Sequence, residues 1–258
     1  MYKIVTTEYG VRIPRLSRSL KIAVVADLHS RESTDVGKII GALKAEKPNI
    51  ILMPGDIFER LDGSCSEGNE AGFELMREAG KIAPTFYSFG NHENGGTRSW
   101  NKIKWWRIKS IPKYYDPTEL ARITECGVAA LDDGYTVYDG IAFGGLSSGL
   151  INEKRAPDVS WLDDFCSLDL PKILLCHHPE YDKKYLRGRD IDLIVSGHAH
   201  GGQWRFFGRG VFAPGQGIFP RYTSGIHDGK FVISRGLKPS GKIPRIFNTP
   251  EVVFVNIN

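Results

Sequence analysis

Polar side chains that could bind a metal ion follow several apolar runs of the sequence. In chain order they are Asp27, His29, Asp56, Asn91, His92, Glu93, His177, His178, His198 and His200. Taken singly, an Asp after a strand usually caps the next helix, and a lone His is usually a partly exposed imidazole. Together, such groups are costly to desolvate unless a cation compensates them. The set therefore predicts a metal centre.

The types of side chain narrow the choice of metal. Imidazole mixed with carboxylate or amide oxygen, without thiolate, suits Mn, Fe or Zn and does not suit a closed structural zinc site or an all-oxygen calcium site. The candidates exceed the needs of one ion, so we predict two divalent ions with a bridging carboxylate, ~3.5–4 Å apart. Asp27 and His29 are two residues apart, as are His198 and His200. In extended chain each such pair points one way, so each pair can serve one centre.

Strands and helices alternate in the first part of the chain. Apolar runs at 21–30, 49–56 and 84–91 are typical of strands, and the segments at 34–47 and 67–83 have helical spacing. Such alternation predicts parallel βαβ units, in which the carboxyl ends of the strands share one edge of a sheet. Asp27, Asp56 and Asn91 are therefore expected to lie close together.

The second half of the sequence is richer in strands. Residues 116–127 predict a helix with Asp116 as N-cap, Pro117 in its first turn and Gly127 after its end. A hairpin is predicted to turn near Asp139 and Gly140. Further apolar runs lie at 172–179, 190–200, 230–237 and 251–257. We expect this half to form a second sheet packed on the first, within a single domain spanning residues 1–258.

Composition excludes several classes of protein. A hydrophobic content of 41% supports a large core, and no apolar stretch reaches the ~18 residues of a membrane span. The first 20 residues lack the features of a secretory signal and predict a strand followed by a loop, so a cytoplasmic location is expected. The four cysteines form no CxxC pair, which indicates free thiols.

The ordered motifs resemble those of the calcineurin-like metallophosphoesterases. The matching blocks are Asp27-Leu28-His29, Gly55-Asp56, Gly90-Asn91-His92-Glu93, a His ending a later strand, and Gly197-His198-Ala199-His200. The sequence from Gly197 to Val252, with GHAHGGQ, FPRYTSG, VISRGL and PRIFNTPEV, is similar to a subgroup of bacterial phosphodiesterases. The resemblance covers most of the chain apart from roughly residues 96–116. It implies an α/β fold, a four-layer α/β/β/α sandwich of two mixed sheets flanked by helices.

The resemblance also implies roles for individual residues. The first metal would be held by Asp27, His29, Asp56 and His200, and the second by Asp56, Asn91, His177 and His198, with Asp56 as the bridge. His177 is preferred to His178 because the family places its ligand two residues before a proline, here Pro179. His92 matches the family's proton donor to the leaving group, and Glu93 is expected to orient it.

The resulting prediction is a dinuclear metal-dependent phosphodiesterase that hydrolyses a phosphate diester or pyrophosphate with a metal-activated hydroxide. Mn is favoured, with Fe or Zn as alternatives, and the substrate is expected to be a small-molecule or lipid-linked phosphoester. Gln203, Arg221 and Arg235 are candidates to reach a substrate phosphate, although an Arg at a strand end is more often a paired surface group.

The segment at 97–116 departs from the subgroup as an insertion rich in Trp, Tyr and basic residues. It could stack bases or sugars, contact the headgroup layer of a membrane, or form a helix that buries its Trp residues. Two other functions stay open. A nuclease is disfavoured by the small net charge of +4, and a noncatalytic metal-binding scaffold is disfavoured because every ligand position is filled.

Overall fold

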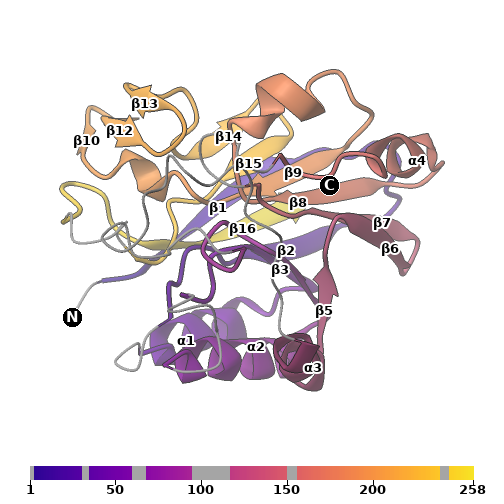
Figure 1. Cartoon of the computed structure of the whole chain (residues 1–258), viewed down its shortest axis with the longest axis horizontal. Coiled ribbons are helices and arrows are strands. Elements are labelled where there is room, and N and C mark those ends of the chain that lie inside the picture. The colour runs from indigo at the N-terminus through magenta and orange to yellow at the C-terminus, as the bar shows by residue number, and fades with distance from the viewer. Residues whose placement is uncertain (1–2, 31–34, 60–67, 95–116, 150–155, 239–243) are drawn as a thin grey trace, which may run out of the picture.

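A computed structural model of the 258-residue chain describes residues 3–30, 35–59, 68–94, 117–149, 156–238 and 244–258 (Figure 1). The Trp-rich segment at 97–116, the predicted N-cap Asp116 and Cys65 lie outside the described residues. The other three cysteines are free thiols, as the sequence predicts. Among the helices that the structure describes, none has the length and hydrophobicity that a bilayer crossing requires.

The first of two six-stranded mixed sheets carries the N-terminal half of the chain. Its strands are β1 (Val5–Val11), β2 (Leu20–Val24), β3 (Ile50–Pro54), β4 (Thr85–Ser88), β5 (Val128–Leu131) and β16 (Glu251–Ile257). Their order is β1-β16-β2-β3-β4-β5, and the run from β2 to β5 is parallel, as the alternation of strands and helices predicts.

The second sheet is built from the later strands. They are β6 (Gly134–Tyr138), β7 (Ile141–Leu146), β8 (Lys172–Cys176), β9 (Leu193–Ser196), β14 (Gly225–His227) and β15 (Phe231–Ile233). Their order is β14-β15-β9-β8-β7-β6. The hairpin of β6 and β7 turns at Asp139 and Gly140, both in the left-handed conformation that this turn needs.

Helices cover the outer faces of the two sheets. The helices α1 (Gly37–Glu46), α2 (Glu70–Ile82) and α3 (Pro117–Glu125) lie on one side of the first sheet, and α4 (Leu162–Ser167) lies beside the second (Figure 1). Helix α3 begins at the predicted Pro117, and Gly127 follows its end with a φ of 76°. This is the expected use of proline at the start and glycine after the end of a helix.

Three apolar clusters hold the layers together. Ile51 of β3 faces the cluster beneath α1 and α2, whereas its neighbour Leu52 faces the cluster between the sheets. Likewise Ile173 of β8 faces the other sheet, and Leu174 packs beside α4. Successive side chains of a strand point to opposite faces, so strands buried on both sides are apolar throughout. The arrangement confirms the predicted α/β/β/α sandwich.

The last strand does not follow the prediction. The run at 251–257 was expected in the second sheet, but β16 lies in the first, parallel to β1 and antiparallel to β2. Six of its seven residues are buried. That burial fits a central strand covered by helices on one side and by the second sheet on the other.

Two small hairpins extend from the loop after β9. They pair β10 (Arg205–Phe206) with β11 (Arg209–Gly210), and β12 (Phe212–Ala213) with β13 (Gly217–Ile218). Strands of two residues give too little periodicity to be recognised in the sequence.

Candidate metal centre

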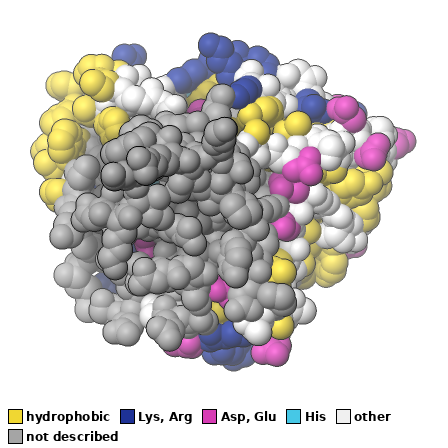
Figure 2. Space-filling view, viewed as in Figure 1, with side chains coloured by type: hydrophobic (Ala, Val, Ile, Leu, Met, Phe, Trp, Pro, Cys, Tyr) yellow, Lys and Arg dark blue, Asp and Glu magenta, His cyan; other side chains and the backbone are white. Residues whose placement is uncertain are grey.

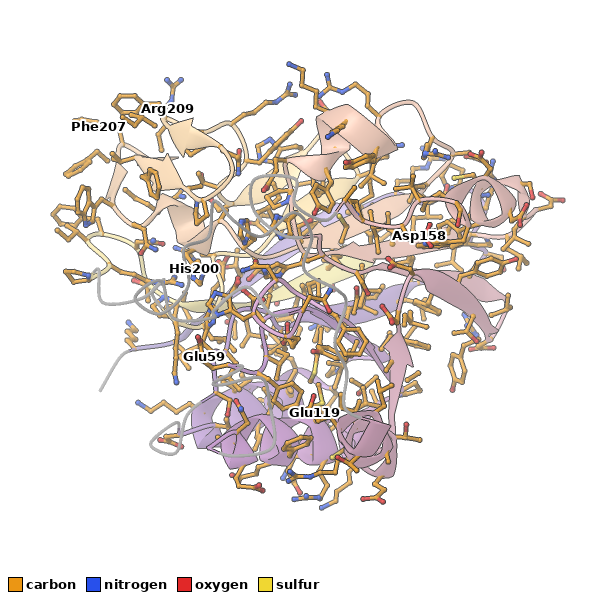
Figure 3. The ribbon with its side chains drawn as sticks, viewed as in Figure 1. Glu59, Glu119, Asp158, His200, Phe207 and Arg209 are labelled. Atoms are coloured by element: carbon orange, nitrogen blue, oxygen red, sulfur yellow. The ribbon has the colours of Figure 1, made fainter. Side chains whose placement is uncertain are left out.

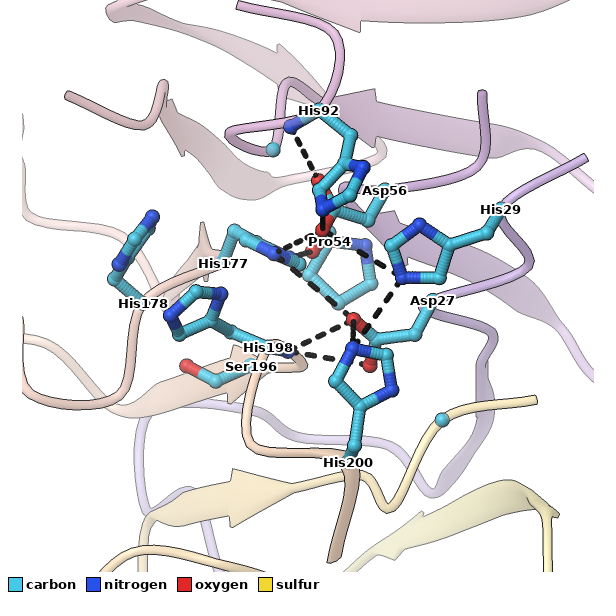
Figure 4. A network of polar contacts seen from close by, with 12 residues as sticks. Asp27, His29, Pro54, Asp56, His92, His177, His178, Ser196, His198 and His200 are labelled. Carbon is cyan, nitrogen blue, oxygen red and sulfur yellow. Dashed lines mark hydrogen bonds and ion pairs between the residues drawn. The ribbon is translucent and has the colours of Figure 1, made fainter. Parts of the chain in front are cut away.

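The polar strand ends meet at one edge where the two sheets face each other. Asp27, Asp56 and Asn91 follow strands of the first sheet, and His177 and His198 follow strands of the second (Figure 4). Backbone hydrogen bonds fix the loops to one another, because the N–H of Asp27 donates to the carbonyl of Gly55 at 3.3 Å. Both sheets thus supply side chains to the same site.

Glycines beside the two aspartates leave room for the carboxylates. A Cβ added to Gly90 would lie 2.1 Å from Oδ1 of Asp56, and one added to Gly197 would lie 2.7 Å from Oδ2 of Asp27. Real Cβ atoms do not approach other atoms so closely, so any side chain at either position would displace the carboxylate. This requirement explains glycine at the start of the GNHE and GHAH motifs.

The prediction that each pair of residues two apart can serve one centre is wrong for the second pair. Asp27 and His29 lie in one group with His200, whereas His198 lies in another group with Asp56 and His177. The inference from spacing required extended backbone, which neither pair has, although Asp27 and His29 still share a group. Asp27, His29, His198 and His200 have φ values of 55°, 45°, 66° and 45°, so the chain is not extended there. Such left-handed conformations are costly for non-glycine residues and concentrate at functional sites.

The first group has two imidazole nitrogens facing each other. Nδ1 of His200 donates to the carbonyl of Lys238 at 2.8 Å, and Nδ1 of His29 lies 3.2 Å from the carboxylate of Glu59. These contacts place the protons on Nδ1 and leave the lone pairs on Nε2. The two Nε2 atoms are 3.3 Å apart, and that of His200 is 3.7 Å from Oδ1 of Asp27. Lone pairs and a carboxylate that converge in this way form an attractive site for a cation.

The second group is defined by buried atoms that lack partners. Oδ2 of Asp56, Oδ1 of Asn91, Nε2 of His177 and Nε2 of His198 are all buried, and none has a hydrogen-bond partner among the described residues. Nε2 of His177 and Oδ2 of Asp56 are 3.0 Å apart but not aligned for a hydrogen bond. Nδ1 of His177 donates to the carbonyl of Pro54 at 2.7 Å, which turns its Nε2 towards the site. Unpaired buried groups are costly, so this set fits a bound metal ion.

Burial sets the charge of several of these side chains. It lowers the pKa of His198 and His200 well below the usual value, so both are neutral at pH 7, as metal ligands must be. Burial also raises the pKa of Asp27. Burial would raise the pKa of Asp56 too, but the charges of His177 and His92 outweigh it and lower that pKa well below its usual range.

His92 lies at the open side of the site and points a ring nitrogen into it. Its side chain is 22% exposed, and its Nε2 is 3.8 Å from Oδ2 of Asp56. Nδ1 of the same ring is 3.0 Å from the carboxylate of Glu59. Burial opposes the charged imidazolium, but Asp56 and Glu59 outweigh it and raise the pKa of His92 to about 9. His92 is thus protonated at neutral pH.

Glu59, rather than Glu93, contacts His92. The carboxylate of Glu93 accepts hydrogen bonds from the backbone N–H groups of Asp56, Phe58 and Gly90 at 3.0, 3.0 and 2.8 Å, so it orders the loops instead. Sequence reasoning missed Glu59, whose signal is only a carboxylate three residues after Asp56. Burial would raise its pKa, but the hydrogen bonds of His29 and His92 hold that pKa at about 2.

The Glu59→Gln variant is expected to lose about 10–100-fold in activity or in metal affinity, the usual effect of removing a partner that orients a metal-site side chain. The neutral amide can orient one imidazole but cannot stabilise a charged one. Steady-state kinetics combined with metal titration would separate the two effects. Glu78→Gln on the outer surface of α2 is a matched control, because the partners of Glu78 among the described residues are the exposed Lys44 and Lys81. Unchanged kinetics and affinity in Glu59→Gln would refute the role.

Four other residues that the sequence analysis singled out do not belong to these two groups. The guanidinium of Arg235 pairs with the buried carboxylate of Glu251, which is the paired alternative to a contact with a substrate phosphate. Arg221 lies on the surface 3.5 Å from Asp228. Gln203 is buried beside the loop of His200. Nδ1 of His178 is 2.8 Å from the carboxylate of Glu180.

A four-layer fold whose strand ends gather aspartate, asparagine and histidine defines a class of metal-dependent hydrolase. Residues 20–202 match the calcineurin-like phosphoesterase family, and the chain belongs to that family.

Similar proteins occur in bacteria and animals. The chain is 26% identical over 254 residues to the putative metallophosphoesterase F40B5.2 of Caenorhabditis elegans, covering 93% of this chain and 49% of that protein. It is 27% identical over 196 residues to the phosphodiesterase YaeI of Escherichia coli K12, covering 72% and 62%. The protein YpbG of Bacillus subtilis is 35% identical over 239 residues, covering 92% and 81%. The chain thus spans about half to three-fifths of the length of the first two.

Proposed function

We propose that this protein is a dinuclear metal-dependent phosphodiesterase. The observation that carries the proposal is that the two groups of ligand atoms converge on one carboxylate. Nε2 of His29, which belongs to the first group, is 3.8 Å from Oδ2 of Asp56, and Nε2 of His177, in the second group, is 3.0 Å from the same oxygen. An oxygen approached from both sides has the position of a bridging ligand.

The proposed ligands divide into two sets. Asp27, His29, Asp56 and His200 would hold one ion, and Asp56, Asn91, His177 and His198 would hold the other. Two bound dications would supply Lewis-acid stabilisation of a phosphoryl group and lower the pKa of a water molecule towards ~7. Two carboxylates against two dications leave positive charge at the site, which favours an anionic phosphoester.

His92 is proposed to protonate the leaving group. Its Nδ1 is occupied by Glu59, so the proton that it can release is on Nε2, which faces the site. A positioned acid of this kind contributes typically ~10²–10⁴-fold to the rate. The carboxylate of Glu59, which contacts Nδ1 at 3.0 Å, would favour the protonated imidazole before the P–O bond breaks.

The choice of a diester substrate is supported by the relative named phosphodiesterase YaeI. Manganese is proposed because a mixed set of imidazole and oxygen ligands without thiolate suits it. The proposed proton donor, His92, and the proposed bridging carboxylate, Asp56, are both present. Their presence favours an enzyme over a noncatalytic scaffold.

Hydrolysis of an aryl phosphodiester and of its matching monoester by metal-stripped protein tests the proposal. We expect turnover of the diester only after Mn²⁺ is added, with two ions bound per chain by elemental analysis. The Asn91→Ala variant should lose turnover and one of the two ions, because Asn91 is proposed to bind only one of them.

Asn256→Ala in β16 is the matched control, because the amide of Asn256 pairs with Glu8 on the outer edge of the sheet. It should keep both the activity and the metal content of the wild type. Binding of two ions without turnover of either ester would overturn the catalytic claim, and binding of a single ion would overturn the dinuclear one.

A further inference from the structure

An apolar rim projects from the two hairpins after β9. We define the rim as Phe206, Phe207, Phe212, Ile218, Phe219 and Phe247. Phe207 is fully exposed, and the exposed fractions of Phe247, Phe219 and Ile218 are 80%, 76% and 73%. Hydrophobic side chains gather at this corner of the surface in Figure 2, and Figure 3 shows Phe207 and Arg209 at its outer margin. Exposed apolar groups concentrated in this way mark an interaction surface.

Three of these phenylalanines sit in a backbone conformation that opposes them. Phe207, Phe219 and Phe247 have φ values of 51°, 50° and 52°. Bulky residues rarely adopt this left-handed region, where glycine or asparagine is preferred. Their rings gain little burial in exchange, because all three are exposed. The folded chain alone therefore gives no reason for phenylalanine at these turns.

Positive charge accompanies the rim. Between Asp192 and Glu251 the sequence has eight Lys or Arg residues and one acidic residue, Asp228, for a net charge of +7. The whole chain has a net charge of +4, so the remaining residues carry −3. The positive charge is thus concentrated in the segment that carries the whole rim, and it stays in excess after Arg235 is paired with the buried Glu251. Such a distribution attracts an anionic surface.

A groove with cationic and hydroxyl groups lies next to the rim. Its volume is about 450 Å³, and its lining includes Arg209, Arg221, Thr223, Ser224 and the rim residue Phe219. Among the described residues that line the groove there is no carboxylate, and the nearby Asp228 is 3.5 Å from the guanidinium of Arg221 on an exposed surface. Two guanidinium groups and two hydroxyls are donors suited to phosphate oxygens. An apolar side chain at the edge of such a groove matches the boundary between headgroups and acyl chains.

We propose that the rim and the groove dock this protein on a bilayer that contains anionic phospholipids. The phenylalanines would enter the headgroup boundary, and Arg209 and Arg221 would contact lipid phosphates. A bilayer is favoured over nucleic acid because the rim includes the aliphatic Ile218, whose side chain has no π-face for a base to stack on. The proposal goes beyond the phosphodiesterase activity and does not depend on it.

Docking in this way would bring the metal centre near the membrane. The amide of Asn248, next to Phe247 of the rim, donates to the carbonyls of His200 and Gln203 at 2.7 and 3.1 Å. The N–H of Val211, between the hairpins, donates to the carbonyl of Gly202 at 3.1 Å. The rim is thus tied to the loop that carries His200.

Co-sedimentation of the full chain with vesicles tests the proposal. We expect binding to vesicles of phosphatidylcholine with phosphatidylglycerol, and weak binding to phosphatidylcholine alone. The double variant Phe207→Asn/Phe219→Asn should lower the partition coefficient roughly tenfold or more, because two apolar groups are lost. Arg209→Glu/Arg221→Glu should remove the preference for the anionic vesicles.

Thermal unfolding separates docking from a structural role. Asparagine tolerates the left-handed conformation, so the phenylalanine variant should unfold at the wild-type temperature or above. Val137→Ser, at a 51% exposed position of β6 remote from the rim, should bind vesicles like the wild type. Absence of wild-type binding, or equal binding by the phenylalanine variant, would overturn the proposal. Self-association or RNA binding that the same variant abolishes, without vesicle binding, would assign the surface to that partner instead.

Discussion

Asp56→Asn is expected to lower kcat/KM for an aryl phosphodiester by roughly 10³-fold or more. The substitution keeps the shape of the side chain but removes the charge that both proposed ions share. Metal stabilisation of the transition state is worth several kcal/mol, and about 1.4 kcal/mol corresponds to a factor of ten, so losing ~4 kcal/mol gives this magnitude. Kinetics at saturating Mn²⁺, with metal content measured on the same samples, checks the result.

Asp139→Asn is the control for this substitution. Asp139 lies at the exposed turn between β6 and β7, where asparagine also accepts the left-handed φ of 50°. We expect wild-type kinetics from it. If Asp56→Asn retained both ions and more than about a tenth of the activity, the bridging role of Asp56 would be refuted.

His92→Asn is expected to slow hydrolysis by ~10²–10⁴-fold for substrates with a poor leaving group. For a nitrophenyl leaving group the loss should be much smaller, because that leaving group departs without a proton. Metal content should stay at the wild-type value, since His92 is not among the proposed ligands. Measurement of kcat across diesters of graded leaving-group pKa gives the comparison, and a steeper dependence in the variant is the expected signature.

A matched histidine substitution is available on the second sheet. His227→Asn changes a half-buried histidine of β14 whose Nε2 contacts the carbonyl of Ser224. Its kinetics should match the wild type. An equal loss for all leaving groups in His92→Asn would contradict proton donation and indicate that His92 positions the substrate.

The positions of helices and strands could be predicted from the sequence better than the pairing of the strands within the sheets. Apolar runs and helical spacing locate β2, β3 and α1, and Ile39, Ile40 and Leu43 are buried on α1 as expected. The place of β16 could not be read from its own residues, since an apolar run suits either sheet. Which sheet it joins depends on pairing with β1 and β2, and such long-range pairing leaves no local signal.

The arrangement of the metal site could likewise be predicted only in part, because local sequence patterns do not reveal backbone conformation or contacts between distant residues. Motif spacing indicated which residues gather, but the split of His198 and His200 between two groups depends on left-handed backbone that periodicity cannot reveal. Glu59 was missed because a carboxylate three residues after Asp56 is common, and its significance appears only when His29 and His92 approach it from other strands. The ligand roles themselves, and the number of ions, remain predictions for the experiments above.

The position of β16 has a consequence for how the chain is made. β1 finds its partner in the first sheet only when β16 has been synthesised, because Thr7 and Glu251 pair across 244 positions. At ~5–20 residues per second, β1 waits on the order of tens of seconds with its edge unpaired. During that time β1 and the apolar edge of β2 that β16 will cover remain unpaired and accessible to chaperones and to other nascent chains. The first sheet is therefore completed only after the loops of Asp27, Asp56 and Asn91 have left the ribosome.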